Sequence, residues 1–312
     1  MPVPQFSPPV RLGARCRLEP VARLKGVIAA MKDLEVNPPR RSNWQKEDGV
    51  KYLVAIDIDG TLVNHDGVMS EAVKEAAQAV VAAGHHVVIS TGRSMGATLP
   101  IVNMVGMTRG YAVSSNGGVT LEIDPAVQDG YRILDRVCFD PSHAITMIKK
   151  RLPDASLALE APDGTVYATE NFEDWSFGAN TVKRTRTEMA AMESAVRVVV
   201  SSSTQTPDDF KQAIYDVGLH GVNYAVGWSA WLDIAAHGVS KASALEQIRR
   251  RLSVDPRHTV AVGDGYNDKE MIHWAARGVA MGQAPAEIAA LATDVTGSVY
   301  EDGLVPILRE LL

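Results

Sequence analysis

Residues 51–62 read KYLVAIDIDGTL, an apolar run that ends in two aspartates one residue apart and a glycine. The run is dense in β-formers, which predicts a buried strand with Asp57 and Asp59 at its carboxyl end. Side chains alternate along a strand, so both carboxylates point to one side, and Gly60 lets the backbone turn sharply. Like charges this close need a cation, a shared proton or bulk water beside them. The stretch favours a magnesium site with a carboxylate nucleophile; an aspartate-rich turn after a core strand is the alternative.

The composition is that of a globular protein. The chain has 312 residues, 46% of them hydrophobic, which suffices for one large domain or two of ordinary size. Its formal net charge is −6, and an excess of Lys and Arg in residues 1–50 makes the rest still more acidic. This acidic body argues against nucleic acid as the main partner.

The cysteines and the apolar runs bear on the location of the protein. Cys16 and Cys138 lie far apart, with no metal-like spacing and no framework of bridges, which favours a reducing cytoplasm. No apolar run approaches a membrane span, and the first residues lack the apolar region of a secretory signal. We therefore expect a soluble, cytoplasmic protein without a membrane partner.

Residues 1–49 read as an appendage to the fold. They contain many prolines and scattered arginines, with one short helical candidate at residues 21–34. We expect a poorly ordered N-terminal extension. A start codon placed too far upstream, with Met31 as the true start, is the alternative.

The remaining chain alternates strands and helices at first. Residues 86–90 and 111–115 read as further buried strands, and the helix between the first two starts after Ser70. Short connections of this kind imply parallel strands with right-handed crossovers, as in a Rossmann-like α/β sheet. The pattern becomes a mixed α+β insert at residues 119–236 and then resumes with a strand at residues 259–264.

Chemically suggestive residues stand at the ends of these strands. Asp57 and Asp59 end the first strand, Thr91 follows the second, Asn116 the third and Asp264 the fourth. Ligands of open parallel sheets lie beyond the carboxyl ends of the strands, so these residues are expected to form one site. Taken singly, each has a structural alternative, such as a helix cap at Thr91 or a left-handed turn at Asn116.

Four motifs in order carry a resemblance to a known family. DIDGTL, STGR, GVSKASAL and GDGYNDKEM resemble the motifs of the haloacid dehalogenase superfamily of phosphatases. The long insert and its NGG turn resemble the Cof-type branch, which has a large α/β cap of the IIB (C2B) kind. The resemblance covers about residues 51–312 and implies a core at residues 50–118 and 237–312, with a cap at residues 119–236.

The resemblance also implies roles for the acidic residues. Asp57 would be the nucleophile and a ligand of Mg²⁺. Asp59 would be the general acid and base, with its carbonyl also on the metal. Asp264 would be the third protein ligand, and Asp268 would support the metal from behind.

The phosphate side is implied in the same way. Thr91, Gly92, Lys241 and Asn267 would hold phosphate oxygens, and Asn116 would support them from behind. Two neighbouring positions depart from the usual motifs: Gln283 stands where an Asn is common, and Ala242 where a Gly is frequent.

The resemblance implies a magnesium-dependent phosphatase that acts on phosphate monoesters of small metabolites, with sugar phosphates favoured. A phosphosugar mutase with the same aspartyl-phosphate chemistry is the runner-up, and a binding module with vestigial chemistry is a further alternative. Nucleotide and pyridoxal phosphates remain open as substrates. In the cap, Glu160, Trp175, Trp228 and Trp231 are conceivable substrate contacts, although aromatic residues in a small domain are more often core.

Overall fold

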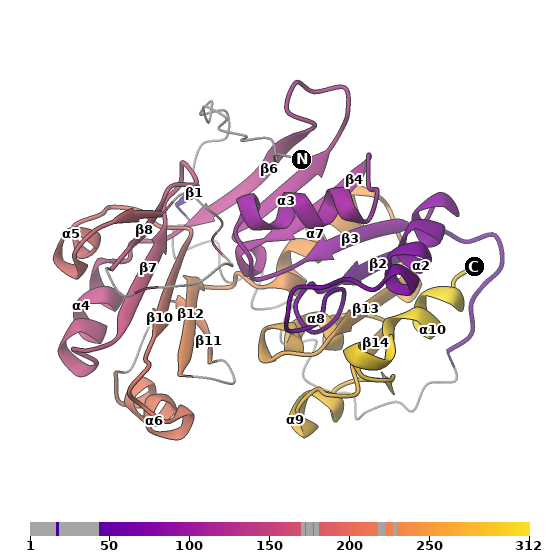
Figure 1. Ribbon diagram of the computed structural model, residues 1–312. Coiled ribbons are helices and arrows are strands. Elements are labelled where there is room, and N and C mark those ends of the chain that lie inside the picture. Colours follow the sequence, from indigo (N-terminus) through magenta and orange to yellow (C-terminus); the bar gives the residue numbers. More distant parts are fainter. Residues whose placement is uncertain are drawn as a thin grey trace, which may run out of the picture.

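The computed structural model describes residues 17–18, 44–169, 172, 177, 181–217, 222–226 and 230–312. Within these residues the chain forms two lobes, each built on its own sheet (Figure 1). The first lobe holds a nine-stranded sheet and the second a six-stranded sheet. The second lobe, residues 139–236, is an insertion into the chain of the first.

The first sheet has a parallel centre. Its central strands are β2 (Leu53–Ile56), β3 (His86–Ser90), β4 (Gly110–Ser114), β13 (Thr259–Gly263), β14 (Arg277–Ala280) and β15 (Asp294–Val295). They lie side by side in the order β4-β3-β2-β13-β14-β15, and each neighbouring pair is parallel. The predicted Rossmann-like sheet is therefore confirmed, and β2, the strand before Asp57, lies in its middle.

Helices cover both faces of this sheet. They are α2 (Glu71–Ala82), α3 (Met95–Met104), α7 (Lys241–Arg251), α8 (Lys269–Trp274), α9 (Ala286–Ala289) and α10 (Leu304–Arg309), with 3₁₀ turns η2 (Ser115–Gly117), η4 (Pro256–His258), η5 (Tyr266–Asp268) and η6 (Val299–Glu301). Val54 and Ile56 pack with α2 and α10, whereas Leu53 and Ala55 pack with α7 and α8. Strands buried on both faces read as continuous apolar runs, which explains the sequence of β2.

The second lobe is a sheet with helices on one face. Its strands, in spatial order, are β11 (Val222–Val226), β12 (Trp231–Ala236), β10 (Arg197–Ser201), β7 (Ser156–Glu160), β8 (Val166–Ala168) and β9 (Thr181–Lys183). Its helices are α4 (Ser142–Arg151), α5 (Arg186–Ala190) and α6 (Pro207–Val217), on the side away from the first lobe in Figure 1. Ile145, Met189 and Phe210 of these helices share one core with the sheet. On the opposite face, Ala158, Val166 and Val199 pack with Phe172 and Phe177.

The second lobe begins later in the chain than the sequence indicated. Strands β5 (Val119–Ile123) and β6 (Tyr131–Cys138) were assigned to the cap, but β5 pairs antiparallel with β4, and β6 with β5. They therefore extend the first sheet. The strand pattern predicted a mixed insert from residue 119 but could not show which sheet its first strands join.

The N-terminal part also meets the first lobe. The rings of Trp44 and Tyr52 meet edge-on, with their centroids 5.7 Å apart. The guanidinium carbon of Arg277 lies over the Trp44 ring, 4.3 Å from its centroid. The predicted extension of residues 1–49 is therefore packed against the fold from Trp44 onward. Residues 1–16 and 19–43, with the candidate start at Met31, lie outside the described residues.

The expectation of no disulfide bridge is wrong at Cys138, which is disulfide-bonded. Strand β1 (Arg17–Leu18) pairs parallel with β6, with Leu18 opposite Cys138. Strand pairing thus brings the N-terminal segment beside this cysteine, which sequence distance could not show. Cys16 lies outside the described residues.

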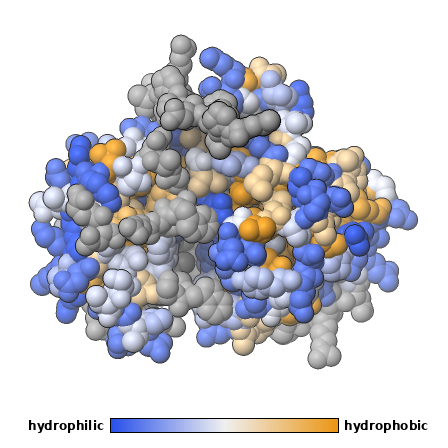
Figure 2. Space-filling model, viewed as in Figure 1, coloured by the Kyte–Doolittle hydropathy of each residue, from blue (hydrophilic) through white to orange (hydrophobic). Residues whose placement is uncertain are grey.

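Two further observations concern the surface and the helices. On the face shown in Figure 2, hydrophilic residues predominate and hydrophobic ones are interspersed among them. None of the helices in the described segments has the length and apolar character needed to cross a bilayer.

Candidate active site

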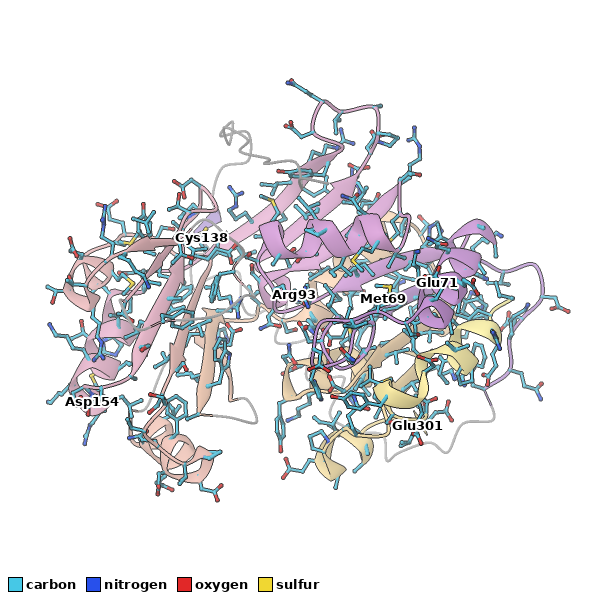
Figure 3. All side chains as sticks on the ribbon, viewed as in Figure 1. Met69, Glu71, Arg93, Cys138, Asp154 and Glu301 are labelled. Atoms are coloured by element: carbon cyan, nitrogen blue, oxygen red, sulfur yellow. The ribbon has the colours of Figure 1, made fainter. Side chains whose placement is uncertain are left out.

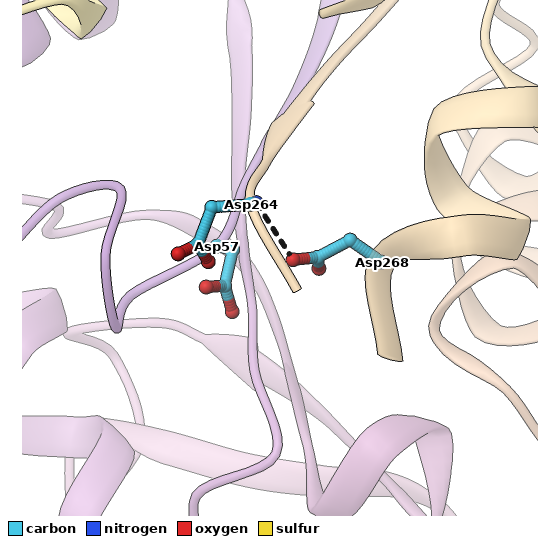
Figure 4. A group of neighbouring side chains, drawn as sticks. All are labelled: Asp57, Asp264 and Asp268. Atoms are coloured by element: carbon cyan, nitrogen blue, oxygen red, sulfur yellow. Dashed lines mark hydrogen bonds between the residues drawn. The ribbon is translucent and has the colours of Figure 1, made fainter. Parts of the chain in front are cut away.

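Three carboxylates meet where the central strands end. Asp57 follows β2 and Asp264 follows β13, and these two strands pair in register with Ile56 opposite Val262. Asp268 comes from η5, one turn after Asp264. Each residue offers one oxygen, and these oxygens all lie within 4.8 Å of one another (Figure 4). The parallel pairing thus joins carboxylates from distant parts of the sequence.

Lys241 lies inside this acidic cluster. Its side chain has 0% exposure, and Nζ lies 2.6 Å from Oδ1 of Asp57 and 2.6 Å from Oδ1 of Asp268. Burial lowers the pKa of Lys241, but the two carboxylates outweigh this effect and hold the pKa above its ordinary value. The lysine is thus charged, and its burial is tolerated because both partners are bound.

The lysine does not balance all of the negative charge. Burial raises the pKa of Asp57 well above 3.8, with Asp268 as the next cause, although Lys241 lowers it. Burial, followed by the charge of Asp268, also raises the pKa of Asp264 to about 7. A buried site that resists ionisation of its own carboxylates fits a metal cation, which would supply the missing positive charge.

The hydrogen bonds separate supporting oxygens from available ones. Oδ2 of Asp268 accepts from the backbone N–H groups of Asp264 and Gly265, at 3.0 and 2.9 Å, and its Oδ1 accepts from Lys241. Both its oxygens are therefore used by the protein. Asp57 accepts from Lys241 through Oδ1 and Asp264 accepts from Gln283 through Oδ2, so within the described segments the other oxygen of each residue is available for a metal ion.

Gly60 is needed beside Asp264. Its φ is +80°, and a Cβ at this position would overlap the carboxylate of Asp264. The glycine of the DIDGTL stretch therefore lets the loop after β2 approach the end of β13 closely.

Asp59 occupies a different position. Its side chain is 39% exposed and forms a two-point ion pair with Arg93, with Nε to Oδ2 at 3.0 Å and Nη2 to Oδ1 at 2.6 Å. Figure 3 places Arg93 in the region between the two lobes. The sequence analysis gave Arg93 no role. Arg93 is the last residue of the STGR motif, and this position was the available signal that it belongs to the site.

Several residues expected to bind phosphate lie around the turn η2, which contains Asn116. Asn267 Nδ2 donates to Oδ1 of Asn116 at 3.1 Å, and a Cβ on Gly92 would contact both asparagine side chains. Thr91 is buried, and its Oγ1 accepts from the N–H of Arg93 at 3.1 Å. Asn116 has φ of 52°, so the left-handed turn foreseen for it is present together with the side-chain contacts.

The second lobe reaches this turn through polar side chains. Asn116 Nδ2 donates to Asp233 Oδ2 at 2.8 Å, and Arg197 Nε donates to both oxygens of Asp233 at 2.9 and 2.8 Å. Ser115 Oγ donates to Glu160 at 2.6 Å, and burial raises the pKa of this glutamate. Strand alternation puts Glu160, Arg197 and Asp233 on the sheet face opposite the helices.

Sequence reasoning named Glu160 but missed Arg197 and Asp233. Polar residues inside the apolar strands RVVVS and WLDIAA were the available signal. Trp231 packs against Phe172, with ring centroids 6.0 Å apart, which agrees with a core role. Trp175 and Trp228 lie outside the described residues.

Comparisons with known proteins identify the family of this chain and several similar proteins. Residues 54–308 match the model of the haloacid dehalogenase-like hydrolase family. The phosphoglycolate phosphatase of Methanoculleus marisnigri is 28% identical over 269 residues, covering 84% of this chain and 96% of that protein. The 5-amino-6-(5-phospho-D-ribitylamino)uracil phosphatase YitU of Bacillus subtilis is 26% identical over 275 residues, covering 83% of this chain and 97% of that protein.

A solved structure shows the same fold. The HAD subclass IIB sugar phosphatase BT4131 matches with a TM-score of 0.67 and 22% identity, covering 83% of this chain and 98% of that chain. The second lobe corresponds to the cap that the NGG turn and the long insert indicated. The chain therefore belongs to the haloacid dehalogenase-like hydrolase family.

Proposed function

We propose that the protein hydrolyses phosphate monoesters of small metabolites, with Mg²⁺ as its cofactor and an aspartyl-phosphate on Asp57 as its intermediate. The observation that carries the proposal is the position of Asp57. This carboxylate lies in an acidic cluster, 2.6 Å from a fully buried lysine, at the end of the central strand.

The residues of the cluster suit Mg²⁺ better than zinc, because all the donors are oxygens. Asp57, Asp264 and the carbonyl of Asp59 would hold the ion, and Asp268 would hold the loop behind it. When bound, the ion neutralises charge between the anionic nucleophile and the anionic phosphate.

The nucleophile and its lysine would carry out the first half-reaction. Asp57 attacks phosphorus, a new O–P bond forms, and the bond to the alcohol oxygen of the ester breaks. Lys241, already bound to Asp57, adds positive charge beside the transferring group. At an effective dielectric constant near 20, one such close pair is worth up to about 4 kcal/mol. That attraction removes much of the repulsion between the two anions.

Asp59 would manage the protons in both half-reactions. It protonates the departing alkoxide and later takes a proton from the water that attacks the phosphoenzyme. Its partial exposure allows contact with a leaving group, and the two-point pair with Arg93 fixes its orientation. Thr91, Gly92 and Asn267 would hold phosphate oxygens, with Asn116 fixing the amide of Asn267.

The side chains of the second lobe favour a substrate with a polar leaving group. The side chains that it brings to the phosphate end are Glu160, Arg197 and Asp233, all of them buried and polar. Carboxylates accept hydrogen bonds from hydroxyl groups, so we favour sugar phosphates as substrates. The curated relatives compared above also act on phosphorylated small molecules, as their names state.

The proposal is tested by phosphate release from p-nitrophenyl phosphate and from a panel of phosphorylated metabolites, with Mg²⁺ present. Asp57→Asn should abolish turnover, because an amide is a poor nucleophile. Asp154→Asn is the control, since Asp154 is exposed on the second lobe, far from Arg93 in Figure 3. Near-native turnover by Asp57→Asn would refute the mechanism.

A second variant tests the proton transfers, and the products formed by the native protein separate hydrolysis from mutase chemistry. Asp59→Asn should slow both proton transfers and let phosphoenzyme accumulate, which acid-quench labelling with a ³²P-labelled substrate measures. Conversion of a sugar 1-phosphate to the 6-phosphate without phosphate release by the native protein would instead favour the mutase.

A further inference from the structure

Gln283 makes contacts that the proposed reaction does not yet use. It follows β14 and joins three separate segments of the first lobe. Its Nε2 donates to the carbonyl of Gly60 at 2.6 Å and to Oδ2 of Asp264 at 3.2 Å. Its Oε1 accepts from the N–H of Val299 at 3.0 Å. The side chain thus links the loop after β2, the residue that follows β13, and η6.

These three bonds fix the orientation of the amide. A glutamine amide offers two N–H donors on nitrogen and an acceptor oxygen, and here each kind is matched to its partner. Reversing the amide would turn its oxygen toward two other oxygens, the Gly60 carbonyl and the Asp264 carboxylate. It would also turn the NH₂ group toward the N–H of Val299. The donor side of Gln283 must therefore face Asp264.

This orientation determines which oxygen of Asp264 is available. Oδ2 is held by Gln283, in the space that the absent side chain of Gly60 leaves open. The Asp264 carboxylate is planar, so fixing one oxygen also fixes the direction of the other. Asp264 shares the 4.8 Å acidic cluster with Asp57 and Asp268. A freely rotating carboxylate would lose that alignment.

We propose that Gln283 is a positioning residue that holds Asp264 ready to bind the metal ion. The inference rests on the proposed magnesium site and adds a residue to it. Hydrogen-bond partners behind metal ligands typically change metal affinity by about 10–100-fold when they are removed. An asparagine, which is one methylene shorter, keeps the same groups but cannot span the same three segments without a shift of the backbone.

The test measures Mg²⁺ binding directly, by isothermal titration calorimetry on the metal-free full-length protein. Gln283→Met keeps the length and removes every hydrogen bond, and we expect a dissociation constant about 10–100-fold higher than that of the native protein. Gln283→Asn should fall between the two. Gln78→Met, at an exposed site on α2, is the matched control and should bind Mg²⁺ as the native protein does.

A kinetic comparison distinguishes positioning from a general structural role. For Gln283→Met, the Mg²⁺ concentration that gives half-maximal rate should rise, while KM for p-nitrophenyl phosphate at saturating Mg²⁺ changes less than about two-fold. Unchanged Mg²⁺ affinity in Gln283→Met, or an equal rise in KM, would overturn the role of Gln283 alone. Failure of the native protein to bind Mg²⁺ would overturn the metal site itself.

Discussion

Asp264→Asn should make the metal-free protein more stable at neutral and alkaline pH. The native carboxylate is buried next to Asp268, and together these raise its pKa to about 7. In the unfolded chain the group returns to about 3.8. On folding, this group must therefore take up a proton or keep an unfavourable charge. An asparagine does not ionise, so its folding has neither cost.

The size of the effect follows from the two pKa values. They differ by roughly three units, and each unit corresponds to about 1.4 kcal/mol. The folded protein binds the proton more tightly, so the contribution of Asp264 to stability is fully present below pH 4 and is lost as the pH rises to 7. The advantage of the asparagine should thus grow from near zero at pH 3 to about 4 kcal/mol above pH 7.

Urea unfolding in EDTA, followed by tryptophan fluorescence between pH 4 and pH 8, measures this difference. Asp154→Asn, on the exposed surface of the second lobe, should show no such dependence on pH. Added Mg²⁺ should stabilise the native protein and have little effect on Asp264→Asn, because a ligand that binds only the folded state stabilises it. The reasoning is refuted if Asp264→Asn is less stable than the native protein at pH 8 without metal.

Two further substitutions test the charges and the packing at the strand ends. Lys241→Met should destabilise the metal-free protein by about 3–5 kcal/mol at pH 8 and abolish phosphate release, because it leaves two buried carboxylates without their partner; a loss below about 1 kcal/mol would contradict this. Gly117→Ala should cost about 2 kcal/mol or more, since φ is +100° and the new Cβ would overlap the carbonyl of Ser240. Gly96→Ala, with open space around it, should be nearly neutral in the same urea titration, and equal losses in both glycine variants would count against the packing argument.

Much of the first lobe could be predicted from the sequence because its signals are local. Each apolar run of the parallel sheet is followed by a polar residue or a glycine, as at Asp57 and Thr91, so both the strand and its functional end are visible. The helix cap at Ser70 is equally local, and its side chain accepts from the N–H of Val73 as expected.

The remaining features depend on contacts between distant segments. Nothing in residues 119–138 specifies which sheet the hairpin joins, since both partners offer apolar strands. Arg197 and Asp233 lie on strands of a different lobe from Asn116, and their sequence does not show that this sheet face meets the first lobe. Arg93 and Gln283 lie within or beside the motifs, but their contacts with Asp59 and Asp264 join separate segments of the chain.

The way in which the second lobe is attached has a consequence for protein engineering. The chain enters this lobe after Cys138 and leaves it after Ala236, and the strands that carry these residues, β6 and β12, contact each other. The strands on which the chain enters and leaves the insert are therefore neighbours. The whole insert could be exchanged as a cassette for that of another phosphatase, which would recruit new leaving groups while Asp57, Lys241 and Asp264 keep their places.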